Sequence, residues 1–138
     1  MSDDKRSRKP VPRPSPESLP FWEAAKERRL LLPRCNACSR FFFPPSQRCR
    51  HCLSPDVNWV ASKGTGRVYS FVVYHRPYHP AFEGDVPYVV AIVELDEGVR
   101  LLSNILGTPP EDVRCDMRVR VTFEDRDGAS IPMFELAP

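Results

Sequence analysis

The segment that runs from Cys35-Asn36-Ala37-Cys38 to Cys49-Arg50-His51-Cys52 decides how the N-terminal half of this chain folds. Each half of it is a CxxC motif, a turn whose two sulfur atoms can face one point, so two such turns can place four thiolates in a tetrahedron. Four thiolates are the donor set of structural zinc, which binds sulfur at about 2.3 Å and leaves no position open for a catalytic water. The sequence therefore predicts a structural Zn²⁺ with four ligands, Cys35, Cys38, Cys49 and Cys52.

The same cysteines are compatible with other chemistry. A CxxC pair can be a redox dithiol, four cysteines can form two disulfides, and a tetrahedron of four sulfurs also binds iron. The polar, proline-rich N-terminus has no apolar signal segment, so we expect a cytoplasmic, reducing location, which argues against disulfides. Iron-binding rubredoxins usually carry glycine after each CxxC, where this chain has Ser39 and Leu53. Zinc is therefore the favoured metal, and iron, redox or disulfide chemistry are the alternatives.

Length and composition divide the chain into three parts. Its 138 residues fit one domain or two very small ones. Five of the 16 prolines lie in residues 10–20, and this density predicts an extended or disordered segment. We expect a disordered basic arm over residues 1–18, a short helix and a rubredoxin-like zinc ribbon over residues 19–60, and an OB-fold domain over residues 61–138.

The charge of the chain is unevenly distributed. Residues 1–16 hold five basic and two acidic side chains, whereas the whole chain has a formal net charge of +2, so the remainder is slightly acidic. Nucleic-acid binders usually set a basic face against the phosphates, and the folded part of this chain lacks the charge for one. No apolar run approaches the ~20 residues of a membrane helix. We therefore expect neither nucleic acid nor a membrane as a partner.

Residues 21–29 have the pattern of a short amphipathic helix. Phe21, Ala24 and Ala25 share one face, and charged residues occupy the other. About ten residues are too few for a helix that is stable alone, so this helix must dock on something. Trp22 is the expected anchor, which packs either on the core of this chain or on a partner.

The residues around the CxxC motifs predict three strands of a zinc ribbon. Residues 30–34 lead into the first motif, residues 40–45 leave it, and residues 57–60 follow the second. Successive strand residues point to opposite faces, so Phe41, Phe42 and Phe43 cannot all enter one small core. We expect at least one of them, Phe42, to meet another module or a partner.

Residues 61–138 are β in character almost throughout. The expected fold class is mainly β, and this part supplies a five-stranded OB-fold barrel with one long first strand. Residues 96–98 predict a hairpin turn, and Glu111 and Asp112 a one-turn helix. The expected strands are residues 67–74, 88–95, 99–105, 117–124 and 131–136.

Taken together, these residues resemble the zinc-ribbon plus OB-fold family associated with acyl-CoA enzymes, long catalogued as a domain of unknown function. The resemblance covers residues 20–136. It departs from the family at Cys115-Asp116-Met117, where a glycine often precedes the methionine. The matching motifs are Phe21-Trp22, both CxxC turns, Phe43-Pro44-Pro45, Gly64-Thr65-Gly66-Arg67-Val68-Tyr69-Ser70-Phe71, His75-Arg76-Pro77, His79-Pro80-Ala81-Phe82, Val86-Pro87-Tyr88 and Glu94-Leu95-Asp96-Glu97-Gly98.

The resemblance implies a non-catalytic accessory subunit that partners a thiolase-like enzyme, or an aldolase or hydratase that degrades steroid side chains. It implies docking through the helix and the ribbon, with the barrel near the path of the acyl-CoA. The aromatic residues of these elements are the expected docking residues, namely Phe21, Trp22, Phe41, Phe42 and Phe43. The alternatives are a single-stranded nucleic-acid-binding protein and a stand-alone acyl-CoA hydrolase or hydratase.

The loop over residues 74–87 is the second informative segment. It is far longer than a tight hairpin, and long structured loops are often functional. Its rings can cover the open end of the barrel, insert into a partner as hot spots do, or supply an acid or base. The chain offers no serine or cysteine nucleophile with a placed base, so we assign no catalytic residue. The candidate residues for contact with acyl-CoA or a partner are His75, Arg76, Tyr78, His79 and Phe82.

Direct contact with acyl-CoA is a separate hypothesis. The phosphates of the ligand require cations, and Lys63, Arg67, Arg76 and Arg100 are expected to cluster at the mouth of the barrel if it holds.

Overall fold

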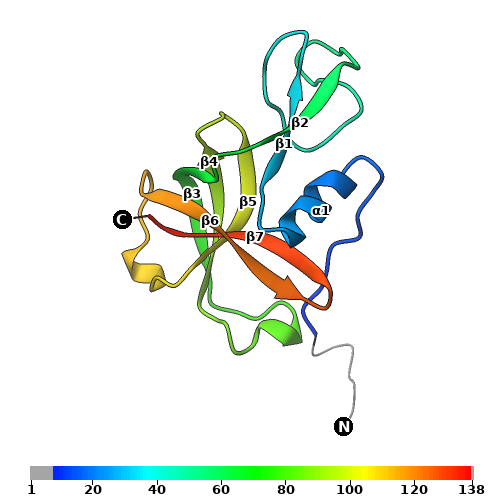
Figure 1. Ribbon diagram of the computed structural model, residues 1–138. Coiled ribbons are helices and arrows are strands. Elements are labelled where there is room, and N and C mark those ends of the chain that lie inside the picture. The colour runs from blue at the N-terminus through cyan, green and yellow to red at the C-terminus, as the bar shows by residue number, and fades with distance from the viewer. Residues whose placement is uncertain (1–7, 138) are drawn as a thin grey trace.

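The computed structural model describes residues 8–137, and Figure 1 shows them as a mainly β molecule with one α-helix. The predicted fold class of short N-terminal helix, zinc ribbon and C-terminal five-stranded barrel is confirmed. Among the described residues, no helix is long and apolar enough to cross a membrane. The elements are α1 (Leu19–Lys26), β1 (Leu31–Cys35), β2 (Val57–Ala61), β3 (Thr65–Tyr74), β4 (Tyr88–Leu95), β5 (Arg100–Leu106), β6 (Arg118–Arg126) and β7 (Ala129–Leu136), with 3-10 helices at Pro80–Phe82 and Pro110–Asp112.

Helix α1 is short because both of its ends are fixed by local geometry. Pro20 lies in its first turn, where the missing N–H costs nothing. Arg28 adopts a left-handed φ of 61°, which ends the helix one residue after its C-cap. The buried face carries Phe21, Ala24 and Ala25, as the sequence pattern predicts. This face packs against β7 and β1, so the helix joins the ribbon to the barrel.

The C-terminal strands close into a barrel in the order β3-β4-β5-β7-β6. Strand β4 alternates half-buried and buried residues along its whole length, so one of its faces forms the barrel interior. The first strand pairs with both of its neighbours, β4 over residues 66–74 and β6 over residues 65–67. A bulge between Val68 and Ser70 bends β3 at this point, and bulges are a common means of turning a strand around a barrel.

The helix, the ribbon and the barrel share one hydrophobic core. Phe21, Leu30 and Leu32 belong to the same buried cluster as the barrel residues Val93 and Phe134. An ion pair reinforces this junction, because Arg28 donates to both carboxylate oxygens of Asp125 at 2.8 and 2.6 Å. The hydroxyl of Ser130 donates to the same carboxylate at 2.6 Å.

The three phenylalanines after the first CxxC motif differ from the sequence prediction. Residues 40–45 form no strand, and only one isolated bridge joins Phe41 to Arg34. The prediction that Phe42 meets another module or a partner is wrong, because this side chain is 1% exposed and packs between Cys35 and Cys49 inside the ribbon. Phe41 and Phe43 instead face the shared core. As predicted, successive rings point to opposite sides of the chain. The side chain that enters the ribbon is Phe42, and those that face the shared core are Phe41 and Phe43.

The N-terminal segment also differs from the prediction. Residues 1–7 of the expected disordered arm lie outside the described part of the chain. Residues 8–18 follow a defined path along the molecule, and Lys9 forms an ion pair with Asp85 at 2.7 Å. The high proline content that suggested disorder also stiffens the chain, so few contacts are enough to hold it in place.

Candidate functional site

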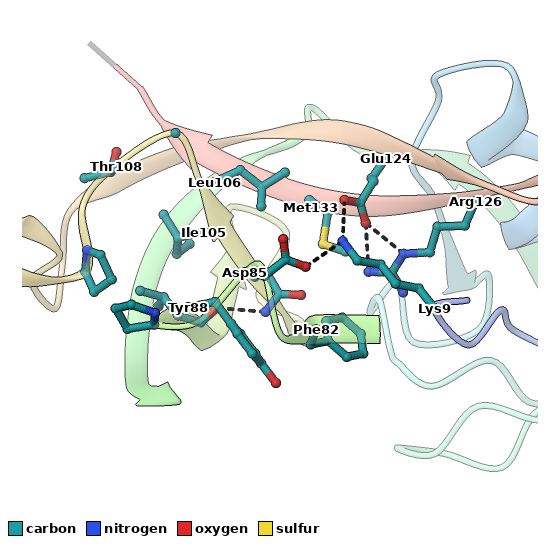
Figure 2. Close-up of a pocket in the computed structure, with 15 residues that line it drawn as sticks. Lys9, Phe82, Asp85, Tyr88, Ile105, Leu106, Thr108, Glu124, Arg126 and Met133 are labelled. Atoms are coloured by element: carbon teal, nitrogen blue, oxygen red, sulfur yellow. Dashed lines mark hydrogen bonds and ion pairs between the residues drawn. The ribbon is translucent and has the colours of Figure 1, made fainter. Parts of the chain in front are cut away.

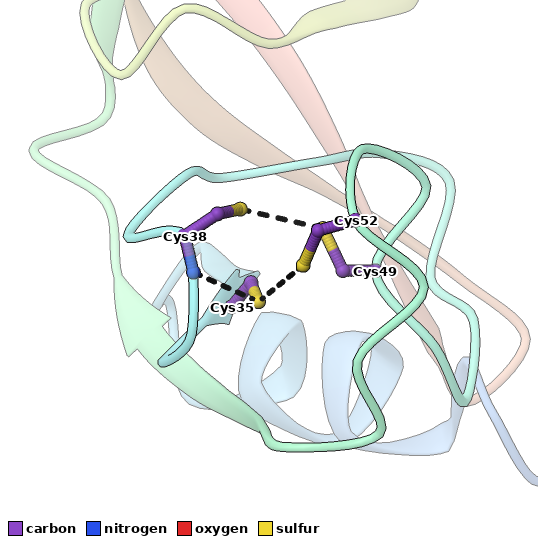
Figure 3. A group of neighbouring side chains, drawn as sticks. All are labelled: Cys35, Cys38, Cys49 and Cys52. Carbon is purple, nitrogen blue, oxygen red and sulfur yellow. Dashed lines mark hydrogen bonds between the residues drawn. The ribbon is translucent and has the colours of Figure 1, made fainter.

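The four cysteines of the two CxxC motifs converge on one point (Figure 3). Cys35 ends β1 and Cys38 lies in the turn after it, while Cys49 and Cys52 come from the second turn. The Sγ atoms of Cys35 and Cys52 are 3.5 Å apart, and those of Cys38 and Cys49 are 3.6 Å apart. All four lie within 4.8 Å of one another. A tetrahedron with Zn–S distances of 2.3 Å has sulfur separations of about 3.8 Å, so the cluster fits Zn²⁺.

Backbone N–H groups prepare the sulfurs to carry negative charge. The N–H of Cys38 donates to Sγ of Cys35 at 3.4 Å, and the N–H of His51 donates to Sγ of Cys49 at 3.2 Å. Burial alone raises the pKa of the Cys49 thiol, but backbone N–H groups of Cys52 and His51 outweigh it and lower the pKa to about 7. The pKa of the Cys52 thiol moves the opposite way: the backbone N–H of Ser54 lowers it, but contacts with the other cysteine sulfurs and burial raise it to about 11, so zinc has to displace protons from the cluster when it binds.

The ribbon around this centre is braced by arginines that contact the chain itself. Arg48 donates to the carbonyl oxygen of Leu53 at 3.0 Å, and Arg50 donates to that of Phe43 at 2.8 Å. With four protein ligands and no open position, the site can hold the chain together but cannot activate a water.

Of the five candidate residues in the loop between β3 and β4, only His79 and Phe82 lie in contact with each other. His79 turns inward, where its Nδ1 accepts a hydrogen bond from the N–H of Ala81 at 3.1 Å and its ring lies 5.9 Å from that of Phe82. His75, Arg76 and Tyr78 are exposed, and the Tyr78 side chain is 77% exposed. The arrangement gives His79 a structural task as the cap of the Pro80–Phe82 turn.

Most of the expected docking residues hold the molecule together instead. Phe21 is 5% exposed, so neither it nor Phe42 offers a surface to a partner. The Phe21 ring lies 4.9 Å from that of Trp22 and 5.3 Å from that of Phe43. Trp22, Phe41 and Phe43 are half-buried against the shared core. The prediction of a docking surface is therefore contradicted for Phe21 and Phe42.

The expected cation cluster for acyl-CoA does not form. Arg67 and Arg100 lie on the outside of the barrel, and both donate to the carboxylate of Glu94, at 3.0 Å each. Arg76 follows the opposite end of β3, nine residues or about 30 Å further along an extended chain. Lys63 precedes β3 in an exposed position. Cations that are scattered and paired in this way do not make a phosphate site.

The sequence prediction missed an apolar patch on the outer surface of β3, β4 and β5, which we call the outer face. The strand register places Leu102 beside Ile92, and Val72 beside Val90, on the side away from the core. Leu102 is 75% exposed and Val72 is 53% exposed. Tyr69 extends the patch, and the guanidinium of Arg100 lies 3.7 Å from its ring.

A signal for the outer face is present in the sequence. Residues 88–95 are apolar at nearly every position, a pattern typical of strands that are covered on both faces. Within the described chain the Tyr88 end of this outer side packs against Phe82, with the two rings 5.7 Å apart, and the outer positions of β4 are half-buried.

Two family profiles match the chain side by side. The rubredoxin-like zinc ribbon domain of ChsH2 matches residues 22–58, and the C-terminal OB-fold domain of ChsH2 matches residues 59–124. The match to a zinc ribbon agrees with the geometry of the four cysteines, which form its structural metal site.

Three proteins illustrate what this chain is similar to. A probable enoyl-CoA hydratase alpha subunit of Thermomonospora curvata is 47% identical over 119 residues, which are 85% of this chain but 37% of the relative's length. A DUF35 domain-containing scaffold protein of Methanocaldococcus jannaschii is 36% identical over 116 residues, 80% of this chain and 82% of the relative. A solved structure described as the Ltp2-ChsH2(DUF35) aldolase contains a chain that is 43% identical, with a TM-score of 0.84, and the match covers 93% of this chain and all of that one.

Proposed function

The chain belongs to the ChsH2 (DUF35) family of zinc-ribbon and OB-fold proteins, and we propose on that basis that it is a non-catalytic accessory subunit of a thiolase-fold acyl-CoA enzyme. Its task is to dock on the enzyme and support assembly of the complex. The observation that carries the proposal is the aldolase structure, whose ChsH2 chain is matched over its whole length. The name of the archaeal scaffold relative supports the same role.

The outer face is the docking surface of this proposal. It combines Leu102, the most exposed leucine of the described chain, with Val72 and Tyr69. A contiguous apolar patch on the surface of a sheet is typical of a site that binds another protein. Arg67 and Arg100, held by Glu94, form a polar rim at one end. The occupant is the thiolase-fold subunit, because the relatives are named as parts of enzyme complexes and the 43% identical chain is found in one.

The metal centre supports this function indirectly. A bound Zn²⁺ supplies folding free energy and no catalysis, since all four positions are taken by sulfur. Cys35 and Cys49 hold Phe42 between them, and Phe43 on the next position rests against Phe21 of the helix. The ribbon in this way fixes α1 against the barrel and keeps the docking surface in one shape.

Direct binding of acyl-CoA by the isolated chain is not part of this proposal. Glu94 pairs with both Arg67 and Arg100, Asp116 pairs with Arg67 as well, and Arg76 lies far from all of them. We expect no binding when acyl-CoA at millimolar concentration is titrated into the chain alone in a calorimeter. The chain alone should likewise neither hydrate nor hydrolyse a panel of acyl-CoA thioesters, a result that also addresses the hydratase name of one relative.

The proposal is tested by co-purification. The tagged chain is expressed with the thiolase-fold and hydratase proteins encoded next to it, and the wild type should bring one of them down in a defined complex. Leu102→Asp should weaken that complex by about thirtyfold, the effect of losing a hot-spot residue worth about 2 kcal/mol. The matched control is Leu53→Asp on the ribbon, where the leucine is 67% exposed and its loss should leave the complex intact.

Two results would contradict the proposal. A chain that purifies alone beside every neighbouring acyl-CoA enzyme is not their accessory subunit. A complex that forms equally well with Leu102→Asp and with the wild type does not use the outer face.

A further inference from the structure

A pocket of about 230 Å³ lies between the loop after β3 and the strands of the barrel (Figure 2). Its walls come from the loop after β3 and from β4, β5, β6 and β7. Ile105, Met133 and Phe82 give it an apolar interior, and charged side chains stand at its rim. Neither the metal centre nor the outer face uses this pocket, and the inference drawn from it is independent of the proposed function.

A lysine of the N-terminal segment lines the rim of this pocket. The ammonium of Lys9 lies 2.7 Å from the carboxylate of Asp85 and 3.7 Å from that of Glu124. It also lies 5.4 Å from the centre of the Phe82 ring, within range of a cation–π contact. Asp85 belongs to the loop after β3 and Glu124 to β6, so one side chain joins two walls of the pocket across its opening.

A second cation holds the segment from the opposite wall. Arg126, whose side chain is only 13% exposed, forms an ion pair with Glu124 at 2.7 Å and donates to the carbonyl oxygen of Pro10 at 3.3 Å. Its guanidinium lies 5.7 Å from the centre of the Phe82 ring. The backbone at residue 10 is therefore fixed next to the lysine that enters the pocket.

The rest of the segment is anchored at a distance from the pocket. Val11, Pro12 and Pro14 line a groove together with Trp22 of α1 and Ala129 of β7. Prolines restrict the free chain, so less conformational entropy is lost when it lies down on this surface. Residues 9–14 therefore run from the pocket, which Lys9 lines, to the groove beside Trp22, and they contact the molecule at both places.

We propose that residues 9–14 form a reversible strap that closes the pocket, with Lys9 as its latch. The strap is reversible because its ion pairs are partly exposed, and pairs of this kind are individually weak. A group that contacts Asp85, Glu124 or the face of Phe82 has to displace Lys9 first, so the strap sets the apparent affinity for such a group. Opening exposes Asp85, Glu124 and the face of Phe82.

The test measures opening of the strap in the full zinc-bound chain. Asp85→Asn with Glu124→Gln removes both carboxylates of the latch and leaves the tryptic bond between Arg8 and Lys9 in place, whereas Lys9 and Arg13 are followed by proline and are not cleaved. Cleavage by trypsin at the Arg8–Lys9 bond should become about tenfold faster, as expected when two weak ion pairs are lost. The control variant, Glu83→Gln with Glu111→Gln, removes the same charge from exposed positions outside the contact with Lys9, and its cleavage should stay at the wild-type rate.

A second measurement reads the pocket directly. Met133 lines the pocket and Met117 does not, so ¹³C-methyl spectra recorded with a neutral gadolinium chelate compare access to Met133 with an internal control. Lys9→Gln, a change at the surface that leaves the fold intact, should increase relaxation of Met133 and leave Met117 unchanged. Salt at 1 M should move the wild type toward the variant, because it screens the latch. Equal cleavage in latch and control variants, or a Met133 signal that ignores Lys9→Gln, would overturn the proposal.

Discussion

At the scale of single residues, a few side chains join segments that are distant in the sequence. Cys35 and Cys52 bring the two ends of the ribbon loop together, and Arg28 ties the end of α1 to Asp125 on β6. Lys9 does the same for the N-terminal segment and the barrel. Each contact has a specific chemistry, and each can be removed by one substitution.

Cys49→Ser should abolish metal binding and unfold the ribbon. The substitution removes one of four thiolates, and structural zinc contributes on the order of 10 kcal/mol of folding free energy in small domains. Zinc content measured by mass spectrometry should fall from one per chain to nearly none, and the ribbon should become sensitive to protease. Cys115→Ser is the control, because Cys115 is exposed and lies outside the cluster. A Cys49→Ser protein that retains its zinc would show that the site tolerates three thiolates.

Asp125→Asn should lower the melting temperature at pH 7. Hydrogen bonds from Arg28 and from Ser130 hold the pKa of the Asp125 carboxyl well below its usual range. A carboxyl with a lowered pKa stabilises the fold fully above its ordinary pKa of about 3.9, and this contribution is lost progressively as the pH falls from that value toward the lower pKa of the folded state.

The difference in melting temperature between wild type and Asp125→Asn should therefore be constant near neutral pH and shrink below about pH 4. Asp127→Asn, in the exposed turn beside it, is the control and should show no such pH-dependent difference. A gap between wild type and Asp125→Asn that stays constant down to pH 2 would mean that the Arg28 ion pair does not stabilise the junction.

At the scale of elements, the position of β3 between two neighbours depends on a glycine. Gly66 pairs with Leu95 of β4 and with Val119 of β6, so it lies where the barrel closes. A Cβ at this position would collide with the carbonyl oxygen of Glu94 and approach Cα of Leu95 to 2.9 Å. Both obstacles are backbone atoms, which cannot rotate away.

Gly66→Ala should consequently destabilise the barrel by about 3 kcal/mol or more, the upper range for overpacking of a core. Denaturant unfolding followed by the fluorescence of the two tryptophans, Trp22 and Trp59, measures the change. Gly84→Ala is the matched control, since a Cβ there meets no atom within 4 Å, and it should unfold at the wild-type midpoint. Equal midpoints for the two variants would contradict the close approach of β3 and β4.

The elements themselves are readable from the sequence to within a few residues. The predicted strand over residues 88–95 coincides with β4, and the turn predicted over residues 96–98 is the one in which Gly98 adopts a φ of 95°. The strand predicted over residues 40–45 is absent, because Pro44 and Pro45 leave Phe41 only one bridge to β1. A local sequence pattern indicates the two-residue period of a strand, but it does not show whether a neighbouring strand is present to pair with it.

At the scale of the whole molecule, the ribbon and the barrel share buried side chains. Phe21, Leu30 and Leu32 lie in one cluster with Phe134 of β7. Loss of order in the ribbon therefore removes contacts from the barrel as well, and the two parts should respond together.

Removal of zinc with a chelator should increase hydrogen exchange beyond the ribbon. We expect faster exchange of backbone amides in β1 and α1, and also in β7, which α1 covers. Addition of Zn²⁺ should restore protection, and addition of Mg²⁺ should not, because four thiolates do not suit that ion. Unchanged exchange in β7 alongside a fully exchanging ribbon would show that the barrel is stable without its neighbour.

The sequence by itself determined the metal site, the order of the strands along the chain and the resemblance to a known family. These depend on the spacing of Cys35, Cys38, Cys49 and Cys52 and on the alternation of apolar residues, which are local properties. The site residues beyond the metal could not be read in the same way. Phe42 and Phe43 have the same side chain and adjacent positions, yet one fills the ribbon and the other meets the helix.

Only the tertiary structure decided which surfaces are free. Leu102 and Leu101 are indistinguishable in sequence, but the register with Ile92 and Val93 places the first outside the barrel and the second inside. The separation of Arg67 from Arg76 and the seat of Lys9 depend in the same way on distant parts of the chain. The physical reason is that spacing and periodicity are fixed by covalent neighbours, whereas burial and ion pairing are fixed by strands and loops that meet only when the barrel closes.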